Sequence, residues 1–393
     1  MPERADCVIV GGGITGLALG WELRRRGMRD VTVVERRYTG AGGSGRNVGR
    51  IRAMQLTREL AVFALAAQRK HERLRDELGM HTLFWRAGYA WVLYEPDEVE
   101  RMAEVIPMLD ELGIPARLHG PAAALRRLPV LRGGETPTGA IIGRDAIVHH
   151  DAAVYGYRKA CATAGVSVLE GRDVTGILKS GDAVAGLTLA DGGEIMAPVV
   201  VNATDGWARE VSAMAGVRAP NAPVRREVFV TEPSKPFMGP AITFYRPSEG
   251  WFNQTLRGEL VAGAVDPEEP VAMEERSTFG FLRRGARVLL RKAPRLGHLQ
   301  VIRQWAGVYD MTPDRKPLVG PVSAVPGFVQ ANGYSGRGFA LAPLVAELLA
   351  GWLVDGERPE LLVPFDADRF GGVPGPAVES HDYYAGYRSE DRR

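Results

Sequence analysis

Residues 5–37 read ADCVIVGGGITGLALGWELRRRGMRDVTVVERR: an apolar run, a glycine cluster, a helical pattern and a second apolar run that ends on Glu35. Gly11, Gly13 and Gly16 follow the G-x-G-x-x-G spacing. Glycines at these positions permit a tight strand-to-helix turn, let the backbone approach a pyrophosphate, and let helix and strand pack closely. In such units an acid about 20 residues after the glycines, here Glu35, binds the ribose hydroxyls of the dinucleotide. The stretch therefore predicts a βαβ unit that binds a dinucleotide.

The acid at position 35 favours FAD or NAD over NADP, although Arg36 and Arg37 leave NADP possible as the ligand.

With 393 residues, of which 45% are hydrophobic and 24% charged, the chain is long enough for two or three domains. Its formal net charge of +2 gives no field that implies a nucleic-acid partner. Cys7 and Cys161 form neither a metal motif nor a disulfide framework, so we expect no metal site and a reducing, cytoplasmic location.

No signal peptide or membrane span is expected. The apolar candidate, residues 340–354, has about 15 residues and contains Pro343 and Glu347, whereas a span takes about 20 apolar residues.

The remaining chain alternates between helical and strand patterns. Helices are expected from residue 58 to 78, from 97 to before 113, from 152 to 164 with Asp151 as N-cap, and from 274 to 292. His71 lies on the apolar face of the first of these helices and is expected to be a packed residue. Strands are expected at 88–94, at 140–142, between 166 and 203, and at 300–309. The strand in APVVVNATDG should return to the sheet that begins at Cys7.

Residues 217–315 contain alternating segments that predict an antiparallel sheet with one covered face. Residues 326–356, PGFVQANGYSGRGFALAPLVAELLAGWLVDG, follow as a strand, a glycine-rich turn and a helix. This turn is interpreted as a second one that contacts the same cofactor.

Together, the fingerprint, the loop GSGRNVGRIRAMQ (residues 43–55), VVNATDGWA and NGYSGRGFALAP resemble the glycine oxidase, D-amino acid oxidase and sarcosine oxidase family of FAD flavoproteins. The loop is most similar to the β subunit of multi-subunit sarcosine oxidases and its dimethylglycine and proline dehydrogenase relatives. The resemblance implies a mixed α/β, α+β fold, with a Rossmann-type FAD-binding domain and an antiparallel-sheet substrate domain interleaved along the chain. The FAD-binding domain would comprise residues 1–85, 140–215 and 316–370, the substrate domain residues 86–139 and 216–315, and a tail residues 371–393.

The same resemblance implies which residues contact FAD, with the helix that begins near Phe339 directing its positive end at the flavin. They are Gly11, Gly13, Ile14, Thr15, Gly16, Glu35, Arg36, Ser44, Arg46, Asn47, Val174, Ala203, Thr204, Trp207, Gly333, Tyr334, Gly336, Arg337 and Gly338.

For the substrate site, Arg52 occupies the position where sarcosine oxidases have a carboxylate-binding arginine, and a guanidinium binds a carboxylate through two hydrogen bonds. Tyr309 matches their tyrosine, and its alternative is a buried core tyrosine. Tyr245 and Trp251 are candidates for the cavity wall, with core packing as the alternative. Arg337 is either a second cation of the site or a solvent-exposed residue.

Departures from the family pattern affect the cofactor and the acceptor. Gly307 stands where monomeric sarcosine oxidases attach flavin through a cysteine, so non-covalent FAD is expected. Ala340 replaces a lysine, and RGELVAGA contains no lysine for reaction with oxygen, which weakens the case for an oxidase. His149 and His150 resemble the neighbourhood of a second flavin, FMN, although surface histidines are the alternative.

The resemblance implies oxidation of a secondary amino acid, preferably sarcosine or another N-alkyl glycine, by hydride transfer to flavin N5. The imine would hydrolyse, and O2 would be reduced to H2O2. The alternatives are a cyclic or D-amino acid dehydrogenase that passes electrons to a quinone or partner subunit, and a flavoprotein subunit of a larger complex. The substrate, its stereochemistry, the acceptor and the oligomeric state stay open.

Overall fold

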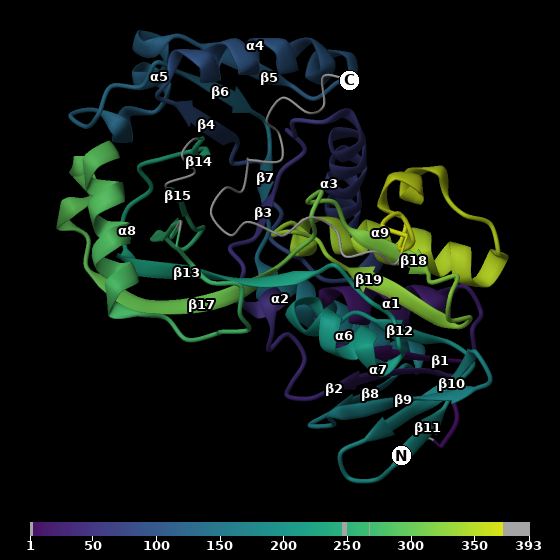
Figure 1. Cartoon of the computed structure of the whole chain (residues 1–393). Helices are drawn as coiled ribbons and strands as arrows, with labels where there is room; N and C mark the ends of the chain where they lie inside the picture. The colour runs from purple at the N-terminus through teal and green to yellow at the C-terminus, as the bar shows by residue number, and fades with distance from the viewer. Residues whose placement is uncertain (1–2, 246–249, 267, 372–393) are drawn as a thin grey trace.

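Strand β1 (Cys7–Val10) lies inside a six-stranded sheet of order β18-β19-β12-β1-β2-β8. The computed structural model describes residues 3–245, 250–266 and 268–371. In this sheet, β2 (Val31–Glu35), β8 (Ser167–Glu170), β12 (Val200–Asn202) and β19 (Phe328–Asn332) run parallel to their neighbours, and β18 (Leu318–Pro321) pairs antiparallel with β19. The βαβ unit and the return of β12 beside β1 are thereby confirmed (Figure 1).

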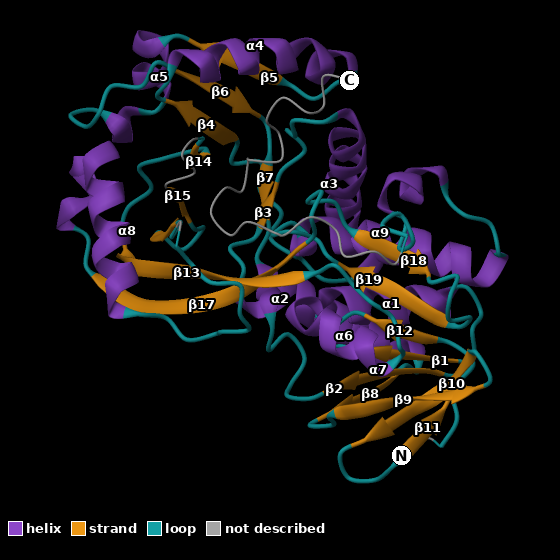
Figure 2. Ribbon diagram, viewed as in Figure 1, coloured by secondary structure: helices purple, strands orange, loops and turns teal. Residues whose placement is uncertain are grey.

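Both faces of this sheet are covered. Alternate side chains of a strand point to opposite faces, so Cys7 and Ile9 enter one core with helices α1 (Ile14–Arg25), α3 (Arg58–Leu78), α6 (His150–Ala164) and α9 (Gly338–Asp355). Val8 and Val10 enter another core with a small antiparallel sheet and α7 (Figure 2). The small sheet comprises β9 (Val174–Ser180), β10 (Ala183–Leu189) and β11 (Glu194–Met196), and η2 (Asp205–Trp207) leads into α7 (Ala208–Met214).

The second large sheet has eight strands in the order β17-β13-β16-β15-β14-β4-β6-β5. Their bounds are Val301–Met311 (β17), Ala222–Pro233 (β13), Glu259–Ala264 (β16), Gly250–Gln254 (β15), Ala241–Phe244 (β14), Tyr89–Leu93 (β4), Gly139–Gly143 (β6) and Ala116–His119 (β5). Helices α4 (Pro96–Glu111), α5 (Pro121–Arg127) and α8 (Phe279–Lys292) flank it, with the turns η1 (Pro129–Leu131) and η3 (Pro294–His298) (Figure 1). Short elements connect the two parts: α2 (Gly43–Arg46), β3 (Arg50–Ile51) and β7 (Ala146–Ile147), which pairs with β3. Residues Glu360–Phe365 form η4.

The expected antiparallel sheet of residues 217–315 is confirmed, since β13, β14, β15, β16 and β17 pair antiparallel with one another. A parallel pairing joins β14 to β4, which lies outside that range. β6 begins before the domain boundary expected at residue 140 and hydrogen-bonds with β4 and β5, and we therefore propose that the first substrate-domain segment extends through Gly143. α8 begins at Phe279 instead of residue 274, because the Thr278 hydroxyl caps the Phe281 N–H at 3.1 Å.

One more helix start differs from expectation, and one helix is longer and more apolar than expected. α6 begins at His150 with His149 as N-cap, so Asp151 lies inside the first turn. α9 has 18 residues and is by length and composition apolar enough to span a membrane, but half of it is buried inside the protein, where it packs on α1 and α3. Of the expected tail, residues 372–393 lie outside the described part of the chain.

His71 satisfies a carbonyl that Pro343 leaves without a donor. Proline has no N–H, so the Phe339 carbonyl four residues earlier loses its helical hydrogen bond. His71 Nε2 lies 3.1 Å from that carbonyl and 3.2 Å from the Ala340 carbonyl. Burial lowers the pKa of His71 to about 4, so the ring is neutral and donates from Nε2.

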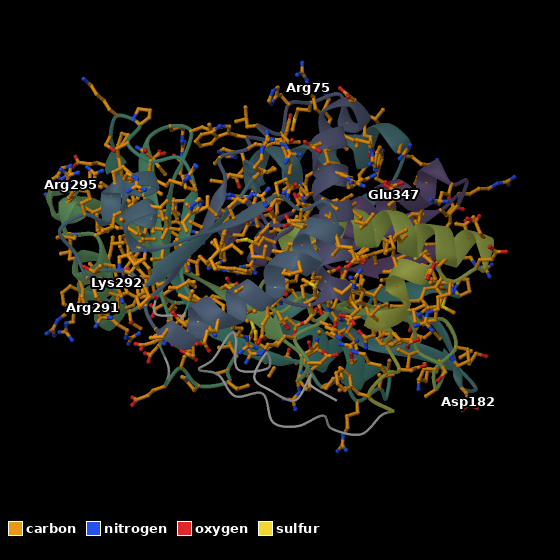
Figure 3. All side chains as sticks on the ribbon, turned by 90° about the horizontal axis from the view of Figure 1, so that it is seen from above. Arg75, Asp182, Arg291, Lys292, Arg295 and Glu347 are labelled. Carbon is orange, nitrogen blue, oxygen red and sulfur yellow. The ribbon has the colours of Figure 1, made fainter. Side chains whose placement is uncertain are left out.

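A buried ion cluster joins α1, α3 and α9. The Lys70 ammonium lies 2.9 Å from Glu22, 2.5 Å from Glu77 and 2.5 Å from Glu347 (Glu347 is labelled in Figure 3). These three carboxylates are close enough together to hold a metal ion, but the lysine supplies the positive charge. Lys70 and Glu22 are almost fully buried, and the more exposed Arg25 and Arg73 add ion pairs at the edge of the cluster.

Replacing Lys70 with Met should lower the free energy of unfolding by about 3 to 5 kcal/mol, because the buried Glu22 carboxylate loses its buried partner and keeps only the half-exposed Arg25. Urea unfolding monitored by circular dichroism measures this change. The control is Lys179→Met on exposed β9, which should alter stability by less than about 0.5 kcal/mol. A loss below about 1 kcal/mol for Lys70→Met would contradict the role given to the cluster.

Candidate active site

A cleft opens at the carboxyl ends of β1, β2 and β12, and backbone forms its floor. Gly11 has a φ of +113°, and a Cβ there would lie 2.4 Å from the Ala203 carbonyl oxygen. A Cβ on Gly16 would lie 1.9 Å from the Gly11 carbonyl oxygen. Only glycine fits at either position, so α1 begins in direct contact with the end of β1 and directs its N-terminus at the cleft.

The polar groups of this cleft suit a dinucleotide. The Glu35 carboxylate accepts hydrogen bonds from the Gly12 and Arg37 N–H groups, each at 2.8 Å. Two fixed oxygens with remaining lone pairs can still accept from ribose hydroxyls. The Ser44 hydroxyl accepts a hydrogen bond from the Ile14 N–H at 2.9 Å. This bond connects the loop of residues 43–55, called the arginine loop below, to the start of α1.

Aromatic and apolar side chains line part of the cleft. The Arg36 guanidinium lies 4.2 Å from the centroid of the Trp207 ring. Val174 and Met214 line the same cleft. The cleft thus combines aromatic and apolar walls, a carboxylate and a helix N-terminus, and its residues fit FAD.

Two acids with raised pKa values lie at this cleft: Asp205 is half-buried and Asp310 is buried. Asp205, which lines it, has a φ of +52°, and Asp310 accepts hydrogen bonds from Asn221 and the Gly333 N–H, both at 2.7 Å. Burial raises the pKa of Asp205 to about 7. Burial and the neighbouring Asp205 charge raise the pKa of Asp310 well above its ordinary value.

A second cavity adjoins the first, and Tyr309 and Gly336 line both. Arginines are prominent among its lining residues, which are Val48, Arg50, Arg52, Gln55, Tyr89, Arg226, Thr243, Gly250, Trp251, Val265, Tyr309, Gly336, Arg337, Ala340 and Leu341. Among the residues described, no carboxylate lines it. The cavity is therefore a site of positive potential beside the cofactor cleft.

Arg52 and Arg337 meet at one amide. Gln55 Oε1 lies 3.4 Å from Arg52 Nη2 and 3.4 Å from Arg337 Nε. Arg337 also donates to the Arg315 carbonyl at 3.1 Å and is only 6% exposed. Arg337 is therefore a buried cation of the cavity and not solvent-exposed.

Arg50 is held by the second sheet. It donates to Asn253 at 3.0 Å, to Thr243 at 3.0 Å and to the Ile242 carbonyl at 3.3 Å. Its guanidinium lies 4.5 Å from the Trp251 ring centroid, and burial lowers its pKa. These contacts fix its orientation at the cavity wall.

Most of the predicted site residues line one of the two cavities, and four do not. Gly16 packs beneath the cleft against Gly11. Arg46 donates to the Ala306 carbonyl at 2.7 Å and thereby ties α2 to β17. Gly333 donates to Asp310 instead of facing the cleft. Tyr245 is fully buried, with its ring 5.8 Å from that of Trp91.

Other lining residues were not predicted as site residues. Three of them lie on strands of the second sheet: Tyr89 on β4, Thr243 on β14 and Arg226 on β13. Gln55 is the last residue of the arginine loop. Only Gln55 carried a sequence signal, through its place at the end of the loop motif.

The described lysines, cysteines and histidines lie outside both cavities. Cys7 and Cys161 are buried. His149 and His150 stack with their ring centroids 5.5 Å apart at the start of α6, and contact with a second flavin stays a prediction.

Known proteins resemble the chain over nearly its whole length. A family model described as FAD dependent oxidoreductase, DAO, matches residues 6–352. The β subunit of sarcosine oxidase from Rhodobacter capsulatus is 28% identical over 360 residues, which cover 88% of this chain and 86% of that protein. The HcnC subunit of hydrogen cyanide synthase from Pseudomonas aeruginosa is 26% identical over 423 residues, covering 96% and 99%. L-proline dehydrogenase from P. horikoshii has a TM-score of 0.87 at 29% identity, covering 94% of this chain and 99% of that one.

Denaturation should release FAD, since no described cysteine or histidine lines either cavity to form a bond with the flavin. After precipitation with acid, the yellow colour and the absorbance near 450 nm are expected in the supernatant. Flavin fluorescence that stays with the chain on a denaturing gel would contradict this expectation.

Asp205→Asn should change how stability depends on pH. The Asp205 pKa is about 7 in the native apoprotein and about 4 in an unfolded chain. The native state therefore binds the extra proton between these values, so this group makes the unfolding free energy fall as pH rises from about 4 to about 7. The stability difference, variant minus unsubstituted protein, should rise over that interval. Urea unfolding of the apoproteins at several pH values measures it, and a constant difference would refute the assignment.

Proposed function

Because the chain belongs to the DAO family of FAD-dependent oxidoreductases and is an FAD-dependent amino-acid oxidoreductase, we propose that it oxidises a secondary amino acid. The preferred substrates are sarcosine or another N-alkyl glycine. The single observation that carries this proposal is the cavity beside the cofactor cleft, lined by Arg50, Arg52, Arg226 and Arg337. Guanidinium groups bind carboxylates through paired, charge-assisted hydrogen bonds.

Different residues of the cavity bind different parts of the substrate. Arg52, positioned by Gln55 and the Tyr89 hydroxyl, receives the substrate carboxylate. Tyr309 stands where the two cavities meet, so a carboxylate on Arg52 places the neighbouring carbon toward the cofactor cleft. Trp251 and Leu341 supply apolar walls that exclude water from the substituent on nitrogen. When bound, FAD accepts the hydride from that carbon.

The relatives support this substrate class. The similar proteins include a subunit of sarcosine oxidase and an L-proline dehydrogenase, and both named substrates are secondary amino acids. Two of the similar proteins are subunits, which supports partner subunits for this chain as well.

The second candidate is a dehydrogenase that passes electrons from proline or a D-amino acid to a quinone or a partner subunit. It is favoured by one observation: no lysine lines either cavity among the described residues. The sequence weakened the case for an oxidase in the same way, because RGELVAGA contains no lysine for reaction with oxygen.

Anaerobic reduction of the bound flavin tests the proposed function. N-methyl, cyclic and D-amino acids are added in turn, loss of the 450 nm absorbance is recorded, and air is then admitted. Bleaching by N-alkyl glycines supports the proposal, and bleaching by none of the compounds contradicts it. Rapid reoxidation with stoichiometric H2O2 identifies an oxidase, whereas reoxidation only by an added dye identifies the dehydrogenase.

Arg52→Ala should raise the dissociation constant of the reducing substrate by about 10- to 100-fold, because a charged hydrogen bond contributes about 1.5 to 3 kcal/mol. The constant comes from the substrate dependence of flavin bleaching. Arg75→Ala, on the exposed surface of α3, is the matched control. An unchanged constant for Arg52→Ala would remove this arginine from the site.

A further inference from the structure

Asp145 is a buried acid for which the proposed reaction has no direct use. It lies between β6 and β7, is 2% exposed and lines neither cavity. Its Oδ1 accepts hydrogen bonds from the Ala53 N–H at 2.7 Å and from Gln68 Nε2 at 3.2 Å. Burying a carboxylate is costly because its charge loses contact with water. A neutral side chain could accept the same hydrogen bonds at a lower cost, which points to a role for the charge itself.

The hydrogen bonds around Asp145 hold the main chain on both sides of Arg52. Ala53, the residue after Arg52, is the donor to Oδ1. On the other side, Gln68 Nε2 donates to the Ile51 carbonyl at 3.2 Å and to Asp145 at the same distance. The strand β3, which contains Ile51, also pairs with β7, which begins directly after Asp145. Asp145 therefore helps to determine where the arginine loop presents Arg52 to the cavity.

Asp145 also holds the start of β4, which contacts the Arg52 side chain. The Asp145 carbonyl accepts a hydrogen bond from the Gly88 N–H at 2.8 Å, and Tyr89 follows as the first residue of β4. The Tyr89 hydroxyl lies 3.5 Å from Arg52 Nη1, and the Tyr89 ring centroid lies 5.2 Å from the guanidinium. The main chain at Arg52 and an aromatic partner of its side chain are thus anchored to one residue.

Asp145 can exchange a proton without releasing the loop. Burial raises the pKa of Asp145 to about 6, although main-chain hydrogen bonds and the charge of Arg52 oppose the rise. Oδ2 is buried and makes no hydrogen bond within the described part of the chain, so it is the atom that receives the proton. Oδ1 keeps its two donors in either state. Arg52 therefore stays in place while the charge near it changes.

Other charged or titratable groups near Asp145 are Tyr89 on β4, the adjacent Arg144, Arg86, and Glu72 on α3. Arg86 donates to Gln68 Oε1 at 3.2 Å and pairs with Glu72, so these two charges compensate each other. The Arg144 side chain is exposed. Arg52 is the cation that both interacts with the Asp145 charge and lines the cavity.

On the basis of the proposed function, in which Arg52 receives the substrate carboxylate, we propose that Asp145 is a positioning residue for Arg52 whose proton is linked to anion binding. Oδ1 holds the arginine loop in both protonation states. When Oδ2 loses its proton, a fixed negative charge near Arg52 repels an anion that Arg52 holds. The bound anion and the Asp145 proton therefore stabilise each other.

The pH dependence of carboxylate binding tests this link without turnover. The holoenzyme is titrated with methoxyacetate, the ether analogue of sarcosine, at values from about pH 5 to about pH 8 while the flavin spectrum is recorded. The dissociation constant should be constant at the acidic end and rise about 3- to 10-fold as the pH increases beyond about 6, because the anion binds less well once Asp145 is ionised. A dissociation constant that does not change with pH would overturn the proposal.

Substitutions at Asp145 separate its charge from its position. The amide oxygen of Asp145→Asn can still accept from the Ala53 N–H, so this variant should bind methoxyacetate with the low-pH affinity at every pH. Asp145→Ala loses the acceptor and should bind it more weakly at every pH. Asp182→Asn is the matched control, in the hairpin between β9 and β10 at the edge of the molecule in Figure 3, and should keep the full pH dependence.

Two results with these variants contradict the proposal. A pH dependence that persists in Asp145→Asn assigns the titrating group elsewhere, for example to Asp205. Equal weakening in Asp145→Asn and Asp145→Ala, at every pH, reduces Asp145 to a structural residue. The pH profile of the unsubstituted holoenzyme decides the question even if neither variant folds.

Flavin bleaching separates this inference from the proposed function. If N-alkyl glycines bleach the flavin and methoxyacetate binds equally well at every pH, the function holds and the inference fails. If methoxyacetate binding follows the Asp145 proton and no amine bleaches the flavin, the carboxylate site and its proton link hold and the proposed function fails. If methoxyacetate binds at no pH, the inference fails whatever the amines do.

Discussion

The structure depends on one steric constraint: backbone must touch backbone where β1 becomes α1. A side chain at Gly16 would collide with the Gly11 carbonyl, and one at Gly11 with the Ala203 carbonyl at the end of β12. These contacts place two strand ends and a helix N-terminus around the same opening. The cofactor cleft, with Glu35 at one side and Ser44 at the other, is a consequence of that packing.

A similar constraint joins the two cavities. A Cβ on Gly336 would lie 2.4 Å from the Tyr309 ring, so the ring occupies the space that a side chain would need. Tyr309 is thus fixed at the boundary by the second glycine turn. Arg226 contacts its ring from the neighbouring β13, and Trp251 lines the same cavity from β15. Residues that are far apart in the chain meet here because β13, β15 and β17 belong to one sheet.

Local patterns predicted much of the fold and little of the cavity wall. The βαβ unit, the hairpins of the small sheet and the strand-turn-helix of β19 and α9 each have a period or a turn signal within one short stretch. The side of a strand that faces a cavity depends on distant partners. Thr243 faces the cavity, and Tyr245, two residues later, would share its face if the strand continued. β14 ends at Phe244, and Tyr245 packs on Trp91 instead. Likewise, nothing in the adjacent pair Arg225 and Arg226 indicates that the first pairs with Glu269 and the second lines the cavity.

The interleaving of the sheets affects how the chain is made. The six-stranded sheet takes its first strand from Cys7–Val10 and its last from Phe328–Asn332, and the eight-stranded sheet draws on residues between them. During synthesis, β12 keeps an unpaired edge until β19 leaves the ribosome, and α1 keeps an uncovered apolar face until α9 follows. Pairings of such long sequence separation form slowly, and exposed strand edges invite aggregation. The six-stranded sheet can therefore be completed only after residue 332 has been made, and FAD, which binds at the completed cleft, stabilises the fully paired sheet.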